Sequence, residues 1–113
     1  MKLKIYGIKN CDTMKKAFTW LKARGIDYDF HDYKKDGLPE GKLEEWAGKV
    51  GWETLANTRG PTWRKIPGDK EKLTKQRALA LLAQHSSAIR RPIVEKGSKL
   101  LVGFDPDEFA KTL

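Results

Sequence analysis

The single cysteine of this sequence, Cys11, stands among lysines at a point where a strand pattern gives way to a helix pattern. A cysteine attacks as its thiolate, which helix N-termini and nearby cations stabilise. Lys9 and Lys15 lie close to it in the chain, at a helix start where sequences normally carry acidic residues. We predict a nucleophilic Cys11 within a basic surround that includes both lysines. The alternative is an inert, buried thiol, because free cysteine is among the most buried residue types.

The elements on either side of Cys11 determine where its thiol is placed. Leu3 and Ile5 fit a strand with one buried face, and the apolar positions after Cys11 repeat with the helical period. Asn10 is the predicted N-cap, which places Cys11 in the first helical turn beside unpaired N–H groups. Lowering a cysteine pKa from ~8.5 to ~7 requires about 2 kcal/mol, whereas a helix dipole supplies only ~0.3 to 1 kcal/mol. Nearby cations must therefore supply the rest.

A second group that could bind a ligand is the guanidinium of Arg59, in a segment rich in chain-breaking residues (58–65). Beside a glycine, here Gly60, a guanidinium has room to bind an anion through two hydrogen bonds. We predict that segment 58–65 is a loop and that Arg59 contacts an anionic ligand. His31 falls on the polar face of the strand predicted over residues 26–31, so we expect this side chain to be solvated.

The apolar periods along the chain define an order of strands and helices. Two strands joined by a helix over residues 3–31 form a β-α-β unit, which should be parallel. The middle of the chain is mainly helical, with a short helical turn over residues 52–57 and a long helix that is capped by residues 67–69. A hairpin over residues 93–102 and a helix that begins at Asp105 and Pro106 complete a β-β-α end. This order predicts an α/β, thioredoxin-like fold in one domain (1–113), with an all-helical insertion at about residues 36–89.

Composition and charge narrow the class of protein. A chain of 113 residues suffices for one core, and a single cysteine excludes an internal disulfide. His31 and His85 show no metal-ligand spacing with each other or with Cys11, so no metal is predicted. The absence of a secretory signal and of a membrane-spanning stretch leads us to expect a cytoplasmic protein. The net charge of +8 comes from lysines scattered along the chain, which favours an anionic small substrate over specific nucleic-acid recognition.

Three motifs, in order and with compatible spacing, resemble the arsenate reductase (ArsC)/Spx family. They are the segment around the cysteine (6–16), Asn-Thr-Arg-Gly (57–60) and Arg-Pro-Ile-Val (91–94), and the first is most similar to the YffB branch. The resemblance spans nearly the whole chain. It implies a thioredoxin-like domain with a helical insertion, a nucleophilic cysteine matching Cys11, and an anion pocket formed by Arg59 and Arg91. It also implies a cis peptide bond before Pro92.

The same resemblance implies a reaction. In thioredoxin-like proteins the backbone before the cis proline faces the cysteine and pairs with a thiol peptide. We therefore expect a glutathione-dependent thiol reductase, with glutathione as co-substrate held near Cys11, Arg91 and Pro92. A one-cysteine enzyme must resolve its mixed disulfide with an external thiol.

The sequence departs from the family pattern at three places. Arsenate reductases carry a histidine where this chain has Gly7, and a third arginine where it reads Leu-Val-Gly-Phe-Asp (101–105). These departures argue against arsenate reduction. Spx regulators commonly carry a second cysteine where this chain has Met14, so an intramolecular redox switch is excluded. The alternative to an enzyme is an Spx-like module that binds an RNA polymerase subunit without redox catalysis.

Overall fold

The computed structural model describes residues 3–9, 11–38, 41–67 and 73–113. The chain divides into two compact units. The first contains residues 1–37 and 91–113, and the second contains residues 38–90. Each unit is described separately, and the expectation of a single domain over residues 1–113 remains a prediction.

The first unit is built on a four-stranded sheet with the order β2-β1-β3-β4. Its strands are β1 (Leu3–Gly7), β2 (Tyr28–Asp32), β3 (Ile93–Lys96) and β4 (Lys99–Val102). β1 is parallel to β2 and antiparallel to β3, and β3 and β4 form a hairpin. The helix α1 (Asp12–Ala23) joins β1 to β2, and α7 (Pro106–Thr112) follows β4. This sheet and its connections confirm the predicted thioredoxin-like fold.

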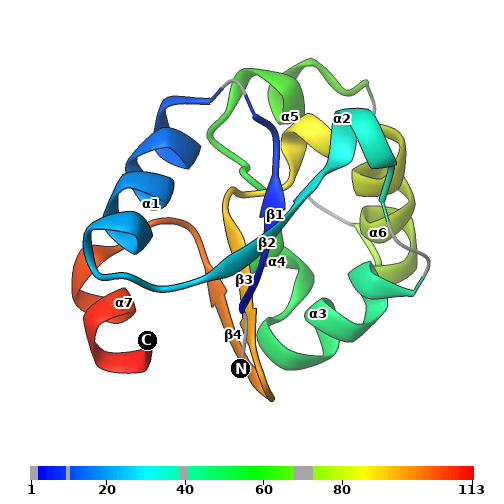
Figure 1. Ribbon diagram of the computed structural model, residues 1–113. Coiled ribbons are helices and arrows are strands. Elements are labelled where there is room, and N and C mark those ends of the chain that lie inside the picture. Colours follow the sequence, from blue (N-terminus) through cyan, green and yellow to red (C-terminus); the bar gives the residue numbers. More distant parts are fainter. Residues whose placement is uncertain (1–2, 10, 39–40, 68–72) are drawn as a thin grey trace. The chain divides into compact units, whose positions relative to one another are not determined.

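One face of the sheet and two helices form the core of this unit. In Figure 1, α1 and α7 lie on the same side of the strands. The fully buried side chains of this core come from β1, β3, α1 and α7, and they are Leu3, Ile5, Met14, Ala17, Leu21, Val94 and Phe109. Their alternation along β1 and their helical spacing along α1 are the patterns that predicted both elements. Burying such side chains stabilises the fold by about 1.5–3 kcal/mol each.

The start of α1 differs from the prediction. The N-cap of α1 is Cys11, in an extended conformation, and the helix itself begins at Asp12. The predicted cap, Asn10, lies outside the described residues. The predicted end of the helix is correct, since Arg24 is its C-cap and Gly25 has φ 66°. A positive φ at this position favours glycine, which has no Cβ to clash with the backbone.

Short connections in the first unit also follow local rules. The expected turn after β2 is a one-turn helix, α2 (Tyr33–Asp36), because Asp32 caps it by accepting a hydrogen bond from the Lys34 N–H at 2.9 Å. Asp105 caps α7 in the same way and Pro106 occupies its first position, as the sequence predicted.

The second unit consists of helices and connecting turns in the part that the structure describes. Its elements are α3 (Lys42–Val50), α4 (Trp52–Leu55), α5 (Pro61–Lys65), α6 (Lys75–Gln84) and the 3-10 turn η1 (Ser86–Ala88). An isolated bridge between Ala56 and Ile89 and a hydrogen bond from the Asn57 N–H to the Ala88 carbonyl (2.8 Å) join the segment after α4 to the segment after η1. The helical character of the insertion agrees with the prediction.

Two boundaries in the second unit were predicted wrongly. The segment expected to be a loop contains α5, because Gly60 is extended as N-cap and Pro61 supplies the fixed φ of the first helical position. The long helix starts later than expected, at Lys75, because Thr74 accepts a hydrogen bond from the Arg77 N–H at 3.3 Å. The cap predicted at Gly68 and Asp69 lies outside the described residues.

The helices of the described segments fall short of a membrane span. Across those segments, we find no helix that combines the necessary length with the necessary apolar character.

Candidate functional site

The thiol of Cys11 lies at the junction of β1 and α1, at the carboxyl end of β1. Its side chain is partly exposed and packs against the core cluster of the sheet. Its sulfur lies near the N–H groups of the first turn of α1, and the backbone carbonyl of Cys11 accepts from the Lys15 N–H at 3.0 Å and closes that turn. The thiol is therefore partly accessible to solvent and lies next to the first turn of α1.

The electrostatic surroundings of Cys11 favour its thiolate. Partial burial raises the pKa of the thiol, but the N–H groups of Met14 and Thr13 lower it by hydrogen bonding, and the charge and hydrogen bonding of Arg91 lower it further. The net effect is a pKa below that of an ordinary cysteine. An N-cap position with a nearby cation is a known cause of such a shift.

The structure brings Arg91 and Cys11 together although 80 positions separate them in the sequence. Arg91 is partly buried two residues before β3, and its peptide bond to Pro92 is cis. Pro92 is fully buried, and its carbonyl accepts a hydrogen bond from the Gly103 N–H at 2.8 Å. Because β3 is antiparallel to β1, its first residue lies at the sheet edge where β1 ends. That shared edge places the guanidinium beside the thiol.

The other predicted site residues differ in their exposure and in their distance along the chain from Cys11. Lys9 and Lys15 are exposed near the start of α1, as expected for a basic surround. Arg59 is exposed in the second unit, and its contact with an anionic ligand remains a prediction. His31 is partly exposed, and its Nε2 lies 2.6 Å from the Gly37 carbonyl oxygen, so this histidine is tied to the backbone after α2.

Three further side chains, which were not predicted as site residues, interact with one another, and one of them, Tyr33, also interacts with Arg91. The Tyr6 hydroxyl donates a hydrogen bond to Glu95 Oε1 at 2.7 Å, and the Tyr33 hydroxyl is buried without a hydrogen-bond partner among the described residues. Burial raises the pKa of Tyr33, as do Tyr6 and Glu95, whereas Arg91 acts in the opposite direction. Alternation along β1 and β3 could have identified Tyr6 and Glu95, because it places both on the sheet face opposite the core that packs against α1.

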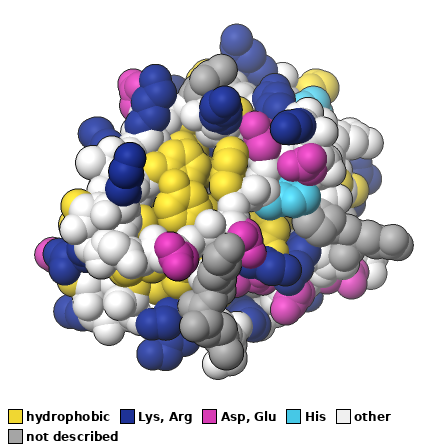
Figure 2. Space-filling view, viewed as in Figure 1, with side chains coloured by type: hydrophobic (Ala, Val, Ile, Leu, Met, Phe, Trp, Pro, Cys, Tyr) yellow, Lys and Arg dark blue, Asp and Glu magenta, His cyan; other side chains and the backbone are white. Residues whose placement is uncertain are grey.

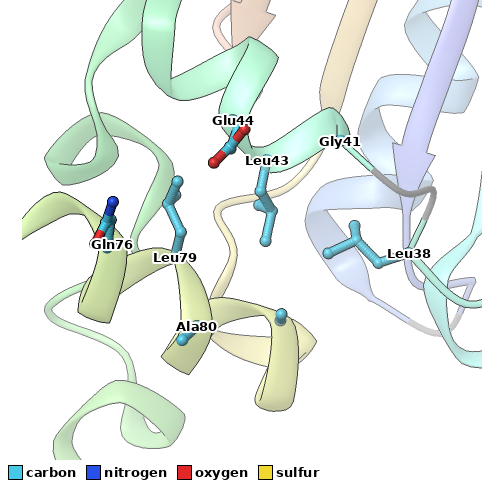
Figure 3. A pocket seen from close by; sticks show the side chains of 8 residues that line it. Leu38, Gly41, Leu43, Glu44, Gln76, Leu79 and Ala80 are labelled. Carbon is cyan, nitrogen blue, oxygen red and sulfur yellow. The ribbon is translucent and has the colours of Figure 1, made fainter.

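The second unit contains a cavity with a volume of about 710 Å³ between α3 and α6 (Figure 3). Its lining is aliphatic or small, apart from Glu44 and Gln76. The other lining residues are Leu38, Gly41, Leu43, Leu79, Ala80 and Ala83. These side chains supply no thiol, imidazole or cation, so the cavity carries no reaction chemistry of its own.

Metal chemistry has no evident site in the described segments. There, no group of three or more His, Cys, Asp and Glu side chains is arranged to hold a metal ion.

Comparisons with known proteins agree with this fold. The ArsC family model matches residues 6–112. A solved YffB protein is 44% identical, with a TM-score of 0.94 and coverage of 99% of both chains. An arsenate reductase (ArsC) related protein from Brucella melitensis is 46% identical, with a TM-score of 0.81 and coverage of 99% of this chain and 94% of the other.

Similarity to regulators is weaker. The global transcriptional regulator Spx of Streptococcus pyogenes is 28% identical over 101 residues, which are 88% of this chain and 75% of the regulator. The family model covers nearly the whole sequence, including Cys11 and Arg91. This chain therefore belongs to the ArsC family.

Proposed function

We propose that this protein is a glutathione-dependent thiol reductase that uses Cys11 as its only nucleophile. The observation that carries the proposal is the position of Cys11 at the N-cap of α1 beside Arg91, which together lower the pKa of the thiol. The thiolate is the species that attacks disulfides, and a lowered pKa increases its fraction at a given pH. An inert structural cysteine would gain nothing from a cation brought to it from the start of β3.

The reaction proceeds through a mixed disulfide. The Cys11 thiolate attacks one sulfur of a substrate disulfide, a new S–S bond forms, and the other sulfur leaves as a thiolate that takes a proton from solvent. A glutathione thiolate then attacks the substrate sulfur of the mixed disulfide, forms a glutathione–substrate disulfide and releases Cys11 as its thiolate. A second glutathione thiolate attacks the glutathione sulfur of that disulfide, releases the remaining substrate thiolate and forms oxidised glutathione. Two glutathione molecules thus supply the two electrons that reduce the substrate disulfide, and Cys11 is unchanged at the end of the cycle.

The two arginines would stabilise negative charges on the thiolate and on the substrate. Arg91 stabilises the Cys11 thiolate before attack and again when it leaves, and it offers hydrogen bonds to a carboxylate of glutathione. The proposal assigns Arg59 a second contact with an anionic group. Pro92 borders the backbone that would pair with the thiol peptide, and Lys9 and Lys15 add positive charge around the thiol.

The test is incubation of the protein with oxidised glutathione, followed by mass spectrometry of the intact chain. We expect one glutathione adduct per chain, located on Cys11 and removed by reduced glutathione. The Cys11→Ser variant is the matched control and should form no adduct. A wild-type protein that forms no adduct, or whose Cys11 alkylates with the pKa of a free cysteine, would contradict the proposal.

Similarity to Spx regulators supports one alternative, a binding module that contacts an RNA polymerase subunit without redox catalysis. The two functions separate in one experiment. Saturable capture of RNA polymerase that is equal for the wild type and Cys11→Ser favours the module. Loss of reductase activity in Cys11→Ser, with unchanged thermal stability, favours the enzyme.

A further inference from the structure

An aromatic groove lies between α1 and the edge strand β2, in the same unit as Cys11. It has a volume of about 320 Å³, and its walls are Phe18 from α1 with Tyr28 and Phe30 from β2. Figure 2 shows hydrophobic side chains at the surface over α1 and β2, bordered by basic and acidic ones. Of the residues that line this groove, the chemistry proposed for Cys11 uses only Lys9.

The three rings form a continuous wall. The Phe18 ring is stacked on the Tyr28 ring, with centroids 5.3 Å apart and planes inclined by 16°, and it meets the Phe30 ring edge-on at 5.0 Å. All three side chains remain partly exposed although they border the core. Aromatic faces and edges that are already arranged in this way offer complementary contacts to a further ring. A pocket of this size accommodates the apolar part of a small molecule.

The position of the groove relates it to the thiol. Phe18 follows Cys11 by seven residues, which in a helix is a rise of about 10 Å with a rotation of only about 20° from the same side. Cys11 and Phe18 both pack against the same core cluster. Lys9, two residues before the thiol, also lines the groove. Cys11 is not itself part of the groove lining, but the groove and the thiol lie along the same side of α1, with Lys9 between them in the chain and at the groove.

Charged side chains at the mouth of the groove influence which charge a bound ligand can carry. Lys9 and Lys35 are exposed cations there, and Asp32 and Asp36 are the acidic members. The Asp32 carboxylate already caps α2 through the Lys34 N–H. That hydrogen bond leaves the carboxylate charged, so the mouth holds two positive and two negative groups, and the preference for an anionic substituent rests on the net charge of +8 of the whole chain.

We propose that this groove binds the aromatic, anionic half of a disulfide substrate, with the ring of that half against Phe18, Tyr28 and Phe30 and the disulfide bond within reach of Cys11. The inference rests on the proposed reductase function and specifies its substrate. In the mixed disulfide formed with glutathione, the aromatic thiol occupies the groove. Attack by Cys11 on the glutathione sulfur breaks the S–S bond and releases the aromatic half as a thiolate, which a proton from solvent neutralises.

The kinetic test compares two disulfides. Cys11 is reacted with 5,5′-dithiobis(2-nitrobenzoate), which is aromatic and anionic, and with oxidised glutathione, which is aliphatic and anionic. We expect Phe18→Leu and Tyr28→Leu to lower the ratio of the two rate constants by about two- to tenfold, as the loss of one aromatic contact predicts. Phe104→Leu, which removes an aromatic ring of the same unit outside the groove, should leave the ratio unchanged. Circular dichroism and thermal melting establish that each variant is folded.

The binding test does not depend on the thiol. In Cys11→Ser, 2-naphthoate is titrated while backbone amide signals are followed by NMR. We expect saturable shifts for Phe18, Tyr28 and Phe30 that weaken in Tyr28→Leu. A protein without a glutathione adduct that still shows these shifts would refute the reductase function and retain the groove as a binding site. An unchanged kinetic ratio without saturable shifts would overturn the groove, as would concentration-dependent shifts without ligand, which indicate a second copy of the chain.

Discussion

At the scale of single residues, the reactivity of Cys11 depends on a balance between burial and stabilisation of its charge. Burial raises the pKa of the thiol, and the N–H groups of Met14 and Thr13 together with Arg91 bring it below the ordinary value. From the sequence, Arg91 and Arg59 were expected to stabilise the thiolate, with Lys9 and Lys15 in a secondary part. In the structure Arg91 is the cation that acts on the thiol, because β3 begins at the same sheet edge.

Replacing Arg91 should shift the reactivity of Cys11 to higher pH. Arg91→Gln keeps a hydrogen-bond donor but removes the positive charge, so the pKa of Cys11 rises towards its ordinary value. Alkylation by iodoacetamide, followed as a function of pH, should become several-fold slower near neutral pH and reach the wild-type rate at alkaline pH. Arg90→Gln, at the exposed neighbouring position, is the matched control and should leave the profile unchanged. Identical profiles for all three proteins would show that Arg91 does not stabilise the thiolate.

At the scale of elements, local patterns in the sequence predicted the helices and strands. Alternation predicted β1 and β2, and the helical period with Arg24 and Gly25 predicted α1. Pairing of β3 with β1, which brings Arg91 to Cys11, is a contact over a long sequence separation and could be inferred only through the resemblance to a family. The errors were at helix starts, where Cys11 rather than Asn10 is the N-cap and where Pro61 begins a helix in a segment expected to be a loop.

The close approach of β1 and α1 makes Gly7 sensitive to substitution. A Cβ at this position would lie 2.5 Å from the sulfur of Met14, which is fully buried. Because the core around Met14 is packed, Gly7→Ala should reduce the free energy of unfolding by about 1–3 kcal/mol, the usual cost of overpacking. Urea denaturation measures the effect.

A second glycine supplies the control for Gly7. Gly48 lies exposed within α3, and a Cβ there meets no atom within 4 Å, so Gly48→Ala should be neutral or stabilising by up to about 1 kcal/mol. Shortening the buried side chain in Gly7→Ala/Met14→Val should restore part of the loss. Equal stability of Gly7→Ala and the wild type would mean that Met14 moves aside at no cost.

The cap of α7 determines how firmly this helix holds Phe109 in the core. The Asp105 carboxylate accepts a hydrogen bond from the Asp107 N–H at 3.0 Å, and the fully buried Phe109 ring packs edge-on against Trp20 and Phe104. Asp105→Ala should cost about 1 kcal/mol, and Asp105→Asn, which can still cap, much less. Thermal unfolding of the two variants compares them directly. A loss of the same size in both would point to charge rather than to capping.

At the scale of the whole molecule, a net charge of +8 should accelerate the encounter with anionic substrates. The rate of reaction of Cys11 with oxidised glutathione, which is anionic, should fall several-fold between ~0.01 M and ~1 M salt, because the screening length shrinks from about 30 Å to about 3 Å. The neutral disulfide of 2-mercaptoethanol should show almost no such dependence. Stopped-flow measurement of the two second-order rate constants tests this expectation.

Two lysines distinguish the general field from a local effect at the thiol. Lys9 is two positions from Cys11, whereas Lys99 is exposed at the turn between β3 and β4, at the sheet edge where β1 begins and thus opposite the thiol. Lys9→Glu and Lys99→Glu change the net charge equally, from +8 to +6. If the local field dominates, Lys9→Glu lowers the rate with oxidised glutathione, and its dependence on salt, far more than Lys99→Glu does, since screening confines charge effects to about 10 Å at 0.1 M salt. Equal effects of the two variants would assign the attraction to the total charge, and the lysines near Cys11 would then have no special part in recruiting the substrate.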